Sequence, residues 1–315
     1  MLKIEPVGIS VIIPVKNEQE NISQLLLELI RVLSSDDEII FIDDGSTDEP
    51  MVEILKHANS ALQVRTRVIR LRKNFGKSTA LSIGLGYVSE DKDYVLTMDS
   101  DLQDDPKYIP LFKETLDKNN LDCVVGWRRN RLELSKKMPS KIYNFLIRKF
   151  SGMQIHDMNC GMKMFKKKVL MKHQVYGEMH RYIPLIIESF GFKVGEVRIE
   201  QRQRLHGKSK YGISRMYTGF IDLMTVLFLY KYGQSPGYVF SALGMFSLVI
   251  SAVFFSLATY RWFAHGMVSV SVTIATFFFV TGFLCIITGL LSEQINSMAQ
   301  VNKDKSRFIK KVEDI

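Results

Sequence analysis

The stretch DYVLTMDSDLQDD, from Asp93 to Asp105, decides how the chain folds and where its chemistry lies. Its first half, residues 94–98, is a short apolar run typical of a buried central strand. The run ends abruptly in four carboxylates, which are Asp99, Asp101, Asp104 and Asp105. Because ligands bind at the carboxyl ends of strands in an open α/β sheet, we expect a counter-charge at this edge.

The type of these side chains indicates which counter-charge. Hard oxygen ligands from Asp99 and Asp101, with the Gln103 amide beyond them, suit Mg2+ or Mn2+. A divalent ion held by one or two carboxylates takes its other ligands from water and substrate phosphates, so the pattern indicates a bound diphosphate. The alternative is a solvated acidic turn that enters a helix at Pro106, where an Asp needs no metal. The position directly after a buried strand favours the metal site.

Strands and helices alternate along the first part of the chain. Strands are expected at 9–15, 38–42, 67–71, 94–98 and 122–126. Helices are expected after the first two strands, from Lys77 to Val88, and from Pro106 onward. This rhythm predicts an α/β fold with a doubly wound, mostly parallel sheet.

Acidic residues also follow the first two strands. Glu18, Asp43 and Asp44 have the chemistry to accept hydrogen bonds from a base and a ribose. The alternative for Glu18 is a helix-start acid that complements the dipole, and for Asp43 to Asp48 a capped turn. Gly76, Lys77 and Ser78 resemble the tail of a phosphate-binding P-loop, but position 71 is Leu and not Gly. No G-x-G-x-x-G follows the first strand either, so a nucleotide would have to be held by the carboxylates.

Two long apolar stretches occupy the last third of the chain. No charged side chain occurs from Tyr232 to Tyr260, and only the titratable His265 occurs from Trp262 to Ser292. A membrane-spanning helix needs about 20 apolar residues, so spans are expected at about 235–260 and 267–291, in preference to buried core helices. The loop between them, with Arg261 and Trp262, would carry one Arg.

The charge next to these spans predicts their orientation. Lysines follow the second span, and basic residues precede the first, so both ends of the chain should be cytoplasmic. The chain enters a strand directly, without a secretory signal peptide, so the sheet domain should also be cytoplasmic. The polar tail 293–315 shows no chemistry.

The formal net charge of +9 is concentrated in three segments, 128–149, 163–172 and 198–215. Such patches favour anions, and two following spans make lipid and phosphate better candidates than nucleic acid, for which no motif is present. Segments 140–150 and 211–232 combine apolar and basic positions as a helix in the headgroup region does; packing on the sheet domain is the alternative. Three isolated cysteines indicate reduced thiols, and neither a disulfide framework nor a zinc site.

Six motifs in order carry a resemblance: VIIPVKNE, IDDGSTD, RKNFGK, MDSDLQ, VVGWRR and RLHGKSKYG. The series resembles the family 2 glycosyltransferases of GT-A fold. It is most similar to the polyprenyl-phosphate glycosyltransferases, which include dolichol-phosphate mannose synthases and bacterial undecaprenyl-phosphate sugar transferases. The resemblance covers about residues 8–230, and the two-span tail agrees with the bacterial membrane branch.

The resemblance implies roles for individual residues. The nucleotide would be cradled by Pro14, Glu18, Asp43 and Asp44, and the metal on the diphosphate would be held by Asp99, Asp101 and Gln103. The phosphates would be met by Arg128, Arg204 and Lys210, the last two closing over the donor diphosphate and the acceptor phosphate. Asp157 would orient the sugar or acceptor, with a helix cap or solvated loop acid as the alternative.

A polyprenyl phosphate acceptor suits these residues. Its second pKa lies near 6, so its oxygen is already an anion at neutral pH and needs no general base. No E-D-x-x-L-x-x-R segment or Q-x-x-R-W motif is present where sugar-polymerising members have them, which counts against a processive synthase. A metal ion with Arg and Lys would stabilise the departing diphosphate.

The expected protein is a membrane-anchored, metal-dependent, inverting glycosyltransferase of the bacterial inner membrane. It would move one sugar, with UDP-glucose slightly favoured, to undecaprenyl or another polyprenyl phosphate at the cytoplasmic face. The expected segments are a catalytic domain 1–210, an interfacial segment 211–234, two spans within 235–292, and the tail. One rival has the same fold acting on a lipid or glycan hydroxyl; the other is a non-catalytic nucleotide-sugar-binding partner of a lipid-sugar flippase. A homo-oligomer is left open.

Overall fold

The computed structural model describes residues 8–61, 64–128, 148–149, 152–153, 155–170, 179–203, 223–228, 230–233, 235–266 and 270–301. The chain divides into two compact units, Met1–Val226 and Leu227–Ile315. The division falls inside the segment 211–234 that the sequence suggested as interfacial. Of the other segment suggested as interfacial, 140–150, all but 148–149 lies outside the described residues.

The first unit is built on a seven-stranded sheet with the order β3-β2-β1-β4-β6-β5-β7. The strands are β1 (Gly8–Val15), β2 (Glu38–Asp43), β3 (Arg65–Arg70), β4 (Lys92–Thr97), β5 (Cys123–Arg128), β6 (Lys163–Lys166) and β7 (Val194–Ile199). Only β6 runs antiparallel to its neighbours, β4 and β5. The expected mostly parallel sheet is therefore confirmed. The sequence located the first five strands but neither β6 nor β7.

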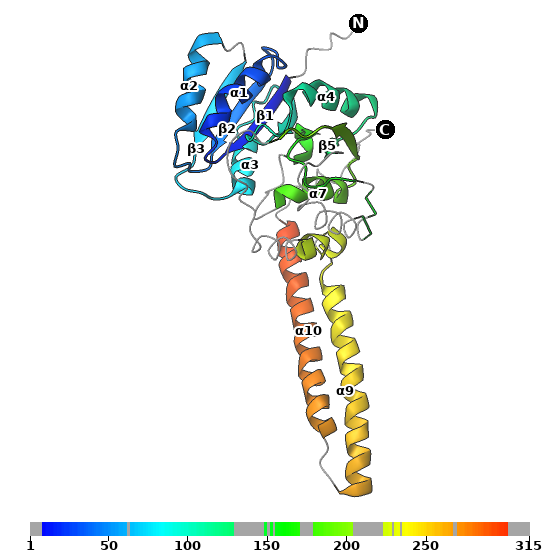
Figure 1. The fold of residues 1–315 in the computed structure, drawn as a ribbon. Coiled ribbons are helices and arrows are strands. Elements are labelled where there is room, and N and C mark those ends of the chain that lie inside the picture. Colours follow the sequence, from blue (N-terminus) through cyan, green and yellow to red (C-terminus); the bar gives the residue numbers. More distant parts are fainter. Residues whose placement is uncertain are drawn as a thin grey trace. The chain divides into compact units, whose positions relative to one another are not determined.

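Helices cover both faces of the sheet. Figure 1 shows α1 (Gln19–Ile30) and α4 (Ile109–Lys118) on one face, and α3 (Lys77–Leu85) and α7 (Ile183–Ser189) on the other. Helix α2 (Pro50–Ala61) packs on α1. Further helical elements in the described part of this unit are short: η1 (Pro106–Tyr108), α6 (Lys167–Leu170) and η3 (Met179–Tyr182). Helix α3 ends at Leu85, three residues before the expected Val88, because the chain turns at Gly86.

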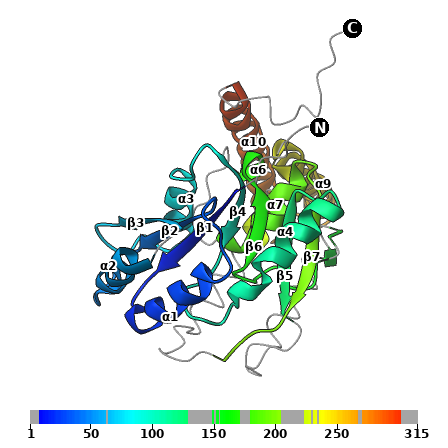
Figure 2. The ribbon, with the colours of Figure 1, turned by 90° about the horizontal axis from the view of Figure 1, so that it is seen from above.

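The core explains why the central strands lack alternation. Val11, Ile12 and Ile13 of β1 are fully buried, as are the four residues 39–42 of β2, because helices cover both faces. The register places Val15 opposite Asp43 and Ile12 opposite Thr97. The carboxyl ends of β1, β2 and β4 therefore meet at one edge of the sheet, and Figure 2 shows β1 lying between β2 and β4.

The second unit contains two long helices, α9 (Gly237–His265) and α10 (Val270–Val301), which pack side by side. The spans Gly237–His265 and Val270–Met298 have mean hydropathies of 2.1 and 2.3, so both are long and apolar enough to cross a membrane. Helix α9 contains Arg261 and Trp262, which the sequence analysis had placed in the loop between the spans. That expectation was wrong, because the helix continues to a left-handed cap at Gly266 (φ 65).

Small residues form the contact between α9 and α10. A Cβ on Gly244 would lie 2.7 Å from the Gly282 carbonyl oxygen, and one on Gly282 would lie 2.8 Å from the Gly244 carbonyl oxygen. Further along α9, the Ser251 hydroxyl donates a hydrogen bond to the Ala275 carbonyl of α10 at 2.7 Å. Close backbone approach through small residues is typical of helices that associate in lipid, where apolar side chains gain little by leaving the bilayer.

This packing predicts the effect of a larger side chain. Gly244→Leu should destabilise the helix pair by about 1–3 kcal/mol, because its side chain would enter the space of the Gly282 backbone. Thermal unfolding in detergent micelles measures the loss. The control is Ala252→Leu, on the same helix at an exposed position, which should leave the midpoint unchanged. Equal midpoints for the two variants would contradict this packing.

Candidate active site

The loop after β4 concentrates negative charge at the edge of the sheet. The Asp99 side chain is 35% exposed, whereas Asp101 and Asp104 are buried. The backbone between them is strained, because Leu102 is buried and has a φ of 59, a left-handed conformation that costs about 1–3 kcal/mol. The backbone N–H of Gln103 donates to Asp101 Oδ1 at 3.2 Å, so the strained turn holds these two residues together.

The fourth carboxylate of the stretch has a structural role. Asp105 Oδ1 accepts the backbone N–H of Lys107 at 3.1 Å, which caps η1, and its other oxygen forms ion pairs with Arg202 at 2.7 Å and Lys107 at 3.0 Å. The acidic-turn alternative thus describes Asp105.

Asp104 has the least satisfied carboxylate of the loop. Its Oδ2 atom is buried and has no hydrogen-bond partner among the described residues. Burial and the neighbouring charges of Asp99 and Asp101 raise the pKa of Asp104 to about 7. A Cβ on Gly161 would lie 2.7 Å from Asp99 Oδ2 and 2.8 Å from Asp104 Oδ2, so both carboxylates gather around this glycine.

Two lysines balance part of this charge. Lys77, the first residue of α3, forms an ion pair with Asp99 Oδ1. Burial opposes protonation of Lys77, but the charges of Asp99, Asp104 and Asp101 outweigh it, and its pKa is raised. Lys163 of β6 lies deeper, donates to the Cys160 carbonyl, and burial lowers its pKa to about 8.

The sequence analysis did not identify Lys77 or Gly161 as site residues. Lys77 belongs to the RKNFGK motif, but it was considered only as the tail of a P-loop. The sequence signal for Lys77 was its place in one of the six motifs that carry the family resemblance. Gly161 gave no local signal, because its role comes from the approach of Asp99 and Asp104 across the sheet.

This donor set fits a divalent cation. The buried Asp104 oxygen without a partner and the raised pKa of that residue both show uncompensated negative charge. In the described part of the chain, no group of three His, Cys, Asp or Glu side chains is arranged to hold a metal. A Mg2+ or Mn2+ ion here would therefore use one or two carboxylates and complete its shell with water and substrate oxygens. Asp99, Asp101 and Gln103 remain the predicted ligands.

The two acidic residues at the end of β2 hold two loops in place. Asp44 accepts the backbone N–H groups of Phe75 at 2.7 Å and Gly76 at 2.9 Å, and it thereby holds the loop that leads to Lys77. Asp43 Oδ1 accepts the backbone N–H of Ser46 at 2.8 Å, as a capped turn requires.

The other predicted nucleotide ligands lie at the same edge. Glu18 Oε2 accepts the side-chain amide of Asn21 at 2.6 Å, without capping α1. Pro14 is half-buried near the end of β1 and opposite Ile42. The structure thus gathers Pro14, Glu18, Asp43 and Asp44 at the ends of β1 and β2, and their contact with a nucleotide stays a prediction.

Arg128 and Asp157 form a nearly buried ion pair on the other side of the site. Arg128 Nε lies 2.7 Å from Asp157 Oδ2, and Nη2 lies 3.1 Å from Asp157 Oδ1. This two-point contact is the strongest geometry available to an Arg and a carboxylate. Arg128 also contributes to the electrostatics of Asp99 and Asp104, so the pair belongs to the same charged cluster.

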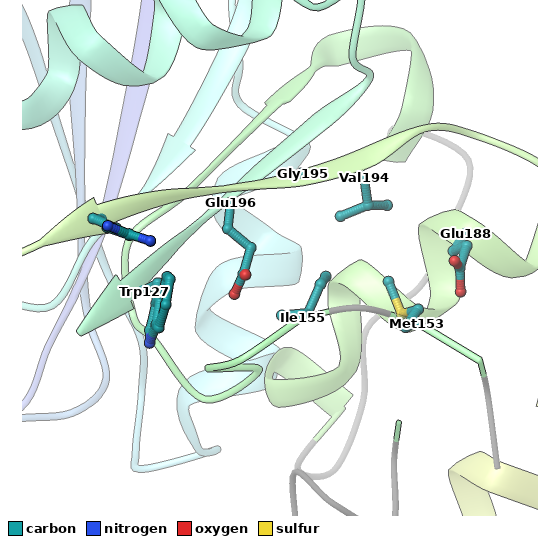
Figure 3. Close-up of a pocket in the computed structure, with 8 residues that line it drawn as sticks. Trp127, Met153, Ile155, Glu188, Val194, Gly195 and Glu196 are labelled. Carbon is teal, nitrogen blue, oxygen red and sulfur yellow. The ribbon is translucent and has the colours of Figure 1, made fainter. Parts of the chain in front are cut away.

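A stacked group of side chains flanks this pair along the chain. Trp127 precedes Arg128 and stacks on His156 with ring centroids 4.1 Å apart, and His156 Nδ1 lies 2.7 Å from Glu196 Oε2. Trp127 and Glu196 line a cavity of about 300 Å3 together with Met153, Ile155, Glu188, Val194, Gly195 and Arg198 (Figure 3). Since Trp127 and His156 are direct neighbours of Arg128 and Asp157, their stacking fixes the backbone that carries the ion pair.

Arg204 and Lys210, the two predicted phosphate contacts, lie outside the described residues. The chain just before them is anchored at the acidic loop. The Arg202 backbone N–H donates to the Gln103 carbonyl at 3.0 Å, and its guanidinium pairs with Glu28 and Asp105, each at 2.7 Å.

Comparison with known proteins identifies the family of this chain and several similar proteins. Residues 10–174 match the protein family described as glycosyl transferase family 2. The dodecaprenyl-phosphate galacturonate synthase of Rhizobium johnstonii is 33% identical over 249 residues, which cover 77% of this chain and 73% of that protein. The undecaprenyl-phosphate 4-deoxy-4-formamido-L-arabinose transferase of Edwardsiella ictaluri is 29% identical over 314 residues, covering 95% and 92%.

A solved structure shares the fold. Glucosyl-3-phosphoglycerate synthase from Mycobacterium tuberculosis, in complex with Mn2+, uridine diphosphate and phosphoglyceric acid, superposes with a TM-score of 0.57 at 17% identity. The match covers 71% of this chain and 78% of that one. It confirms the GT-A fold that the motif series implied.

The Arg128 and Asp157 pair generates a stability prediction. Arg128→Met should cost about 3–5 kcal/mol of unfolding free energy, because Asp157 would keep a buried charge without its partner. The double change Arg128→Met with Asp157→Leu should recover much of that loss while sugar transfer stays absent. Urea unfolding in micelles is the measurement, with the exposed Arg31→Met, at the end of α1, as control. A single change as mild as the control would show that the pair is not a buried constraint.

Proposed function

The chain belongs to glycosyl transferase family 2, in its polyprenyl-phosphate branch, and from this premise we propose the reaction in detail. It transfers one sugar from a uridine diphosphate sugar to a polyprenyl phosphate, with inversion at the anomeric carbon. The observation that supports this most directly is the cluster of Asp99, Asp101 and Asp104 at the carboxyl end of β4. The positive charges of Lys77 and Arg128 act on this cluster.

The chain's own residues divide the work on the donor. Glu18, Asp43 and Asp44, at the ends of β1 and β2, face the nucleotide, and Asp99 and Asp101 hold the divalent cation. That cation, when bound, neutralises the diphosphate as it leaves. Solved relatives of the same fold contain Mn2+ or Mg2+, which supports a divalent cation in this family. Arg128 adds positive charge near the phosphates, where it stabilises the charge that develops on the leaving group.

The acceptor supplies its own nucleophile. A phosphate monoester is largely ionised at neutral pH, so no residue has to remove a proton from it. Asp157, which the motif resemblance assigns to orienting the sugar or acceptor, has both oxygens engaged by Arg128. This arrangement favours the phosphate acceptor over the rival with a hydroxyl acceptor, which would need a free base.

The two long apolar helices of the second unit support a location in a membrane. Helices α9 and α10 would hold the chain in the bacterial inner membrane, with the catalytic unit and both ends in the cytoplasm, where nucleotide sugars are made. Segments 140–150 and 211–234 would lie at the headgroups.

A donor panel tests the reaction. The purified protein in vesicles containing undecaprenyl phosphate and Mn2+ should form a lipid-linked sugar with at least one uridine diphosphate sugar. The panel should include glucose, which the motif resemblance favours, and the two sugars in the relatives' names, galacturonate and 4-deoxy-4-formamido-L-arabinose. Donor binding without turnover on any of them would instead support the non-catalytic partner of a flippase.

Metal dependence generates a second prediction. Asp101→Asn should lower transfer by at least about 100-fold, because it weakens the hold on the cation that stabilises the leaving diphosphate, and losing one such electrostatic contribution lowers the rate by about that factor. Thermal unfolding in the absence of metal should change little. Chelation of the wild-type protein should abolish transfer, and Mn2+ or Mg2+ should restore it. Asp117→Asn, in the same unit but on α4, is the matched control; full activity of Asp101→Asn would remove the metal assignment.

A further inference from the structure

We propose that Lys77 is an internal counter-cation of the metal site, which pairs with Asp99 in the donor-free protein and contacts the donor diphosphate once a divalent cation binds Asp99. This inference rests on the proposed function for the identity of the donor. It assigns a function to a residue that the motif series contained but left without a role.

The position of the ammonium is the first support. Lys77 Nζ contacts Asp99 Oδ1, and the charges of Asp104 and Asp101 also act on it. These are the carboxylates that the divalent cation would need. An ammonium and a divalent cation that both contact Asp99 would repel each other at short distance, so the two cations compete for this carboxylate.

Access is the second support. The side chains of Lys77 and Asp99 are 32% and 35% exposed, so the pair is open to ligands from the solvent. Lys163, the other lysine of the cluster, is buried at 3% exposure and is tied to the Cys160 carbonyl. Of these two lysines, only Lys77 has a flexible stem that can move its charge by several ångströms without opening the core.

The loop before Lys77 fixes where that charge can move. Asp44 accepts the backbone N–H groups of Phe75 and Gly76, and Gly76 has a φ of 91, which a residue with a side chain rarely adopts. On the other side, Ser78 Oγ lies 2.8 Å from His180 Nδ1. The Cα of Lys77 is therefore held between the nucleotide end and the metal end of the site, and only its side chain is free to change partner.

The location on α3 is unfavourable for a cation unless an anion is present. Lys77 is the first residue of this nine-residue helix, where the dipole disfavours positive charge by about 0.3–1 kcal/mol. An anion at the same place is favoured both by the helix N-terminus and by the ammonium. Asp99 satisfies this preference in the donor-free protein, and a diphosphate satisfies it after Asp99 binds the cation.

This exchange makes metal and nucleotide binding cooperative. In the absence of nucleotide, the cation must displace Lys77 from Asp99, which weakens binding. With nucleotide present, the displaced ammonium gains the diphosphate as its new partner, so each ligand strengthens the other by the same factor.

Metal binding to the protein without acceptor tests the inference. Isothermal titration of Mn2+ into Lys77→Met should show tighter binding than to wild type in the absence of nucleotide. The gain in Mn2+ affinity on adding uridine diphosphate, expected at about 5- to 150-fold for wild type, should become clearly smaller, because only the part that comes from direct contact between the cation and the diphosphate remains. Lys77→Arg, which keeps the charge, should retain the coupling. Lys73→Met removes a nearby exposed lysine that lies over the Phe75 ring, and it should behave as wild type.

The outcomes separate this inference from the proposed function. Unchanged or weaker Mn2+ binding in Lys77→Met, with coupling intact, would overturn the counter-cation role even if sugar transfer proceeds. Tighter Mn2+ binding with reduced coupling would support it even if no sugar is transferred from any donor. If Lys77→Met does not fold, Lys77→Gln is compared in the same titration, and the same two results decide.

Discussion

The structure of the catalytic unit depends on the accumulation of carboxylates at the carboxyl end of β4. Burial, together with the neighbouring charges of Asp99 and Asp101, raises the pKa of Asp104 to about 7, and one of its oxygens has no hydrogen-bond partner in the described part of the chain. Such a cluster costs stability unless cations reach it. Three cationic side chains from three different elements reach this cluster: Lys77 of α3, Lys163 of β6 and Arg128 of β5.

The same charges connect the two ends of the donor site. Asp44, at the end of β2, holds the loop whose next residue pairs with Asp99, at the end of β4. The region predicted for the nucleotide and the region predicted for the metal are therefore linked by one short segment of backbone, residues 75–77.

The two units of the chain use opposite means of stabilisation. The sheet unit buries apolar strands between helices and places its charges at one edge. The helical unit keeps its apolar side chains exposed, as Phe246 and Phe263 show, and joins its helices through glycine and serine. This difference suits a protein that binds a charged donor from water and an acceptor anchored in lipid.

The sequence by itself determined the elements whose signal is local. The apolar runs at 9–15, 38–42 and 94–98 predict buried parallel strands because both faces are covered, and the acidic residues after them predict a site because strand ends meet at one edge. The uncharged stretches after residue 232 predict two long apolar helices for the same local reason. An apolar run does not show where its helix ends, so α9 continues through the expected loop and reaches its cap only at Gly266.

Only the tertiary structure decided which charges meet. β6 is a four-residue strand with lysines at both ends, and it gives no apolar pattern, yet it is inserted antiparallel between β4 and β5 and brings Gly161 and Lys163 to the carboxylates. Arg128 and Asp157 are 29 residues apart, and Lys77 and Asp99 are 22 apart. Such partners are chosen by the three-dimensional balance of buried charge, which acts through space and leaves no periodicity along the chain.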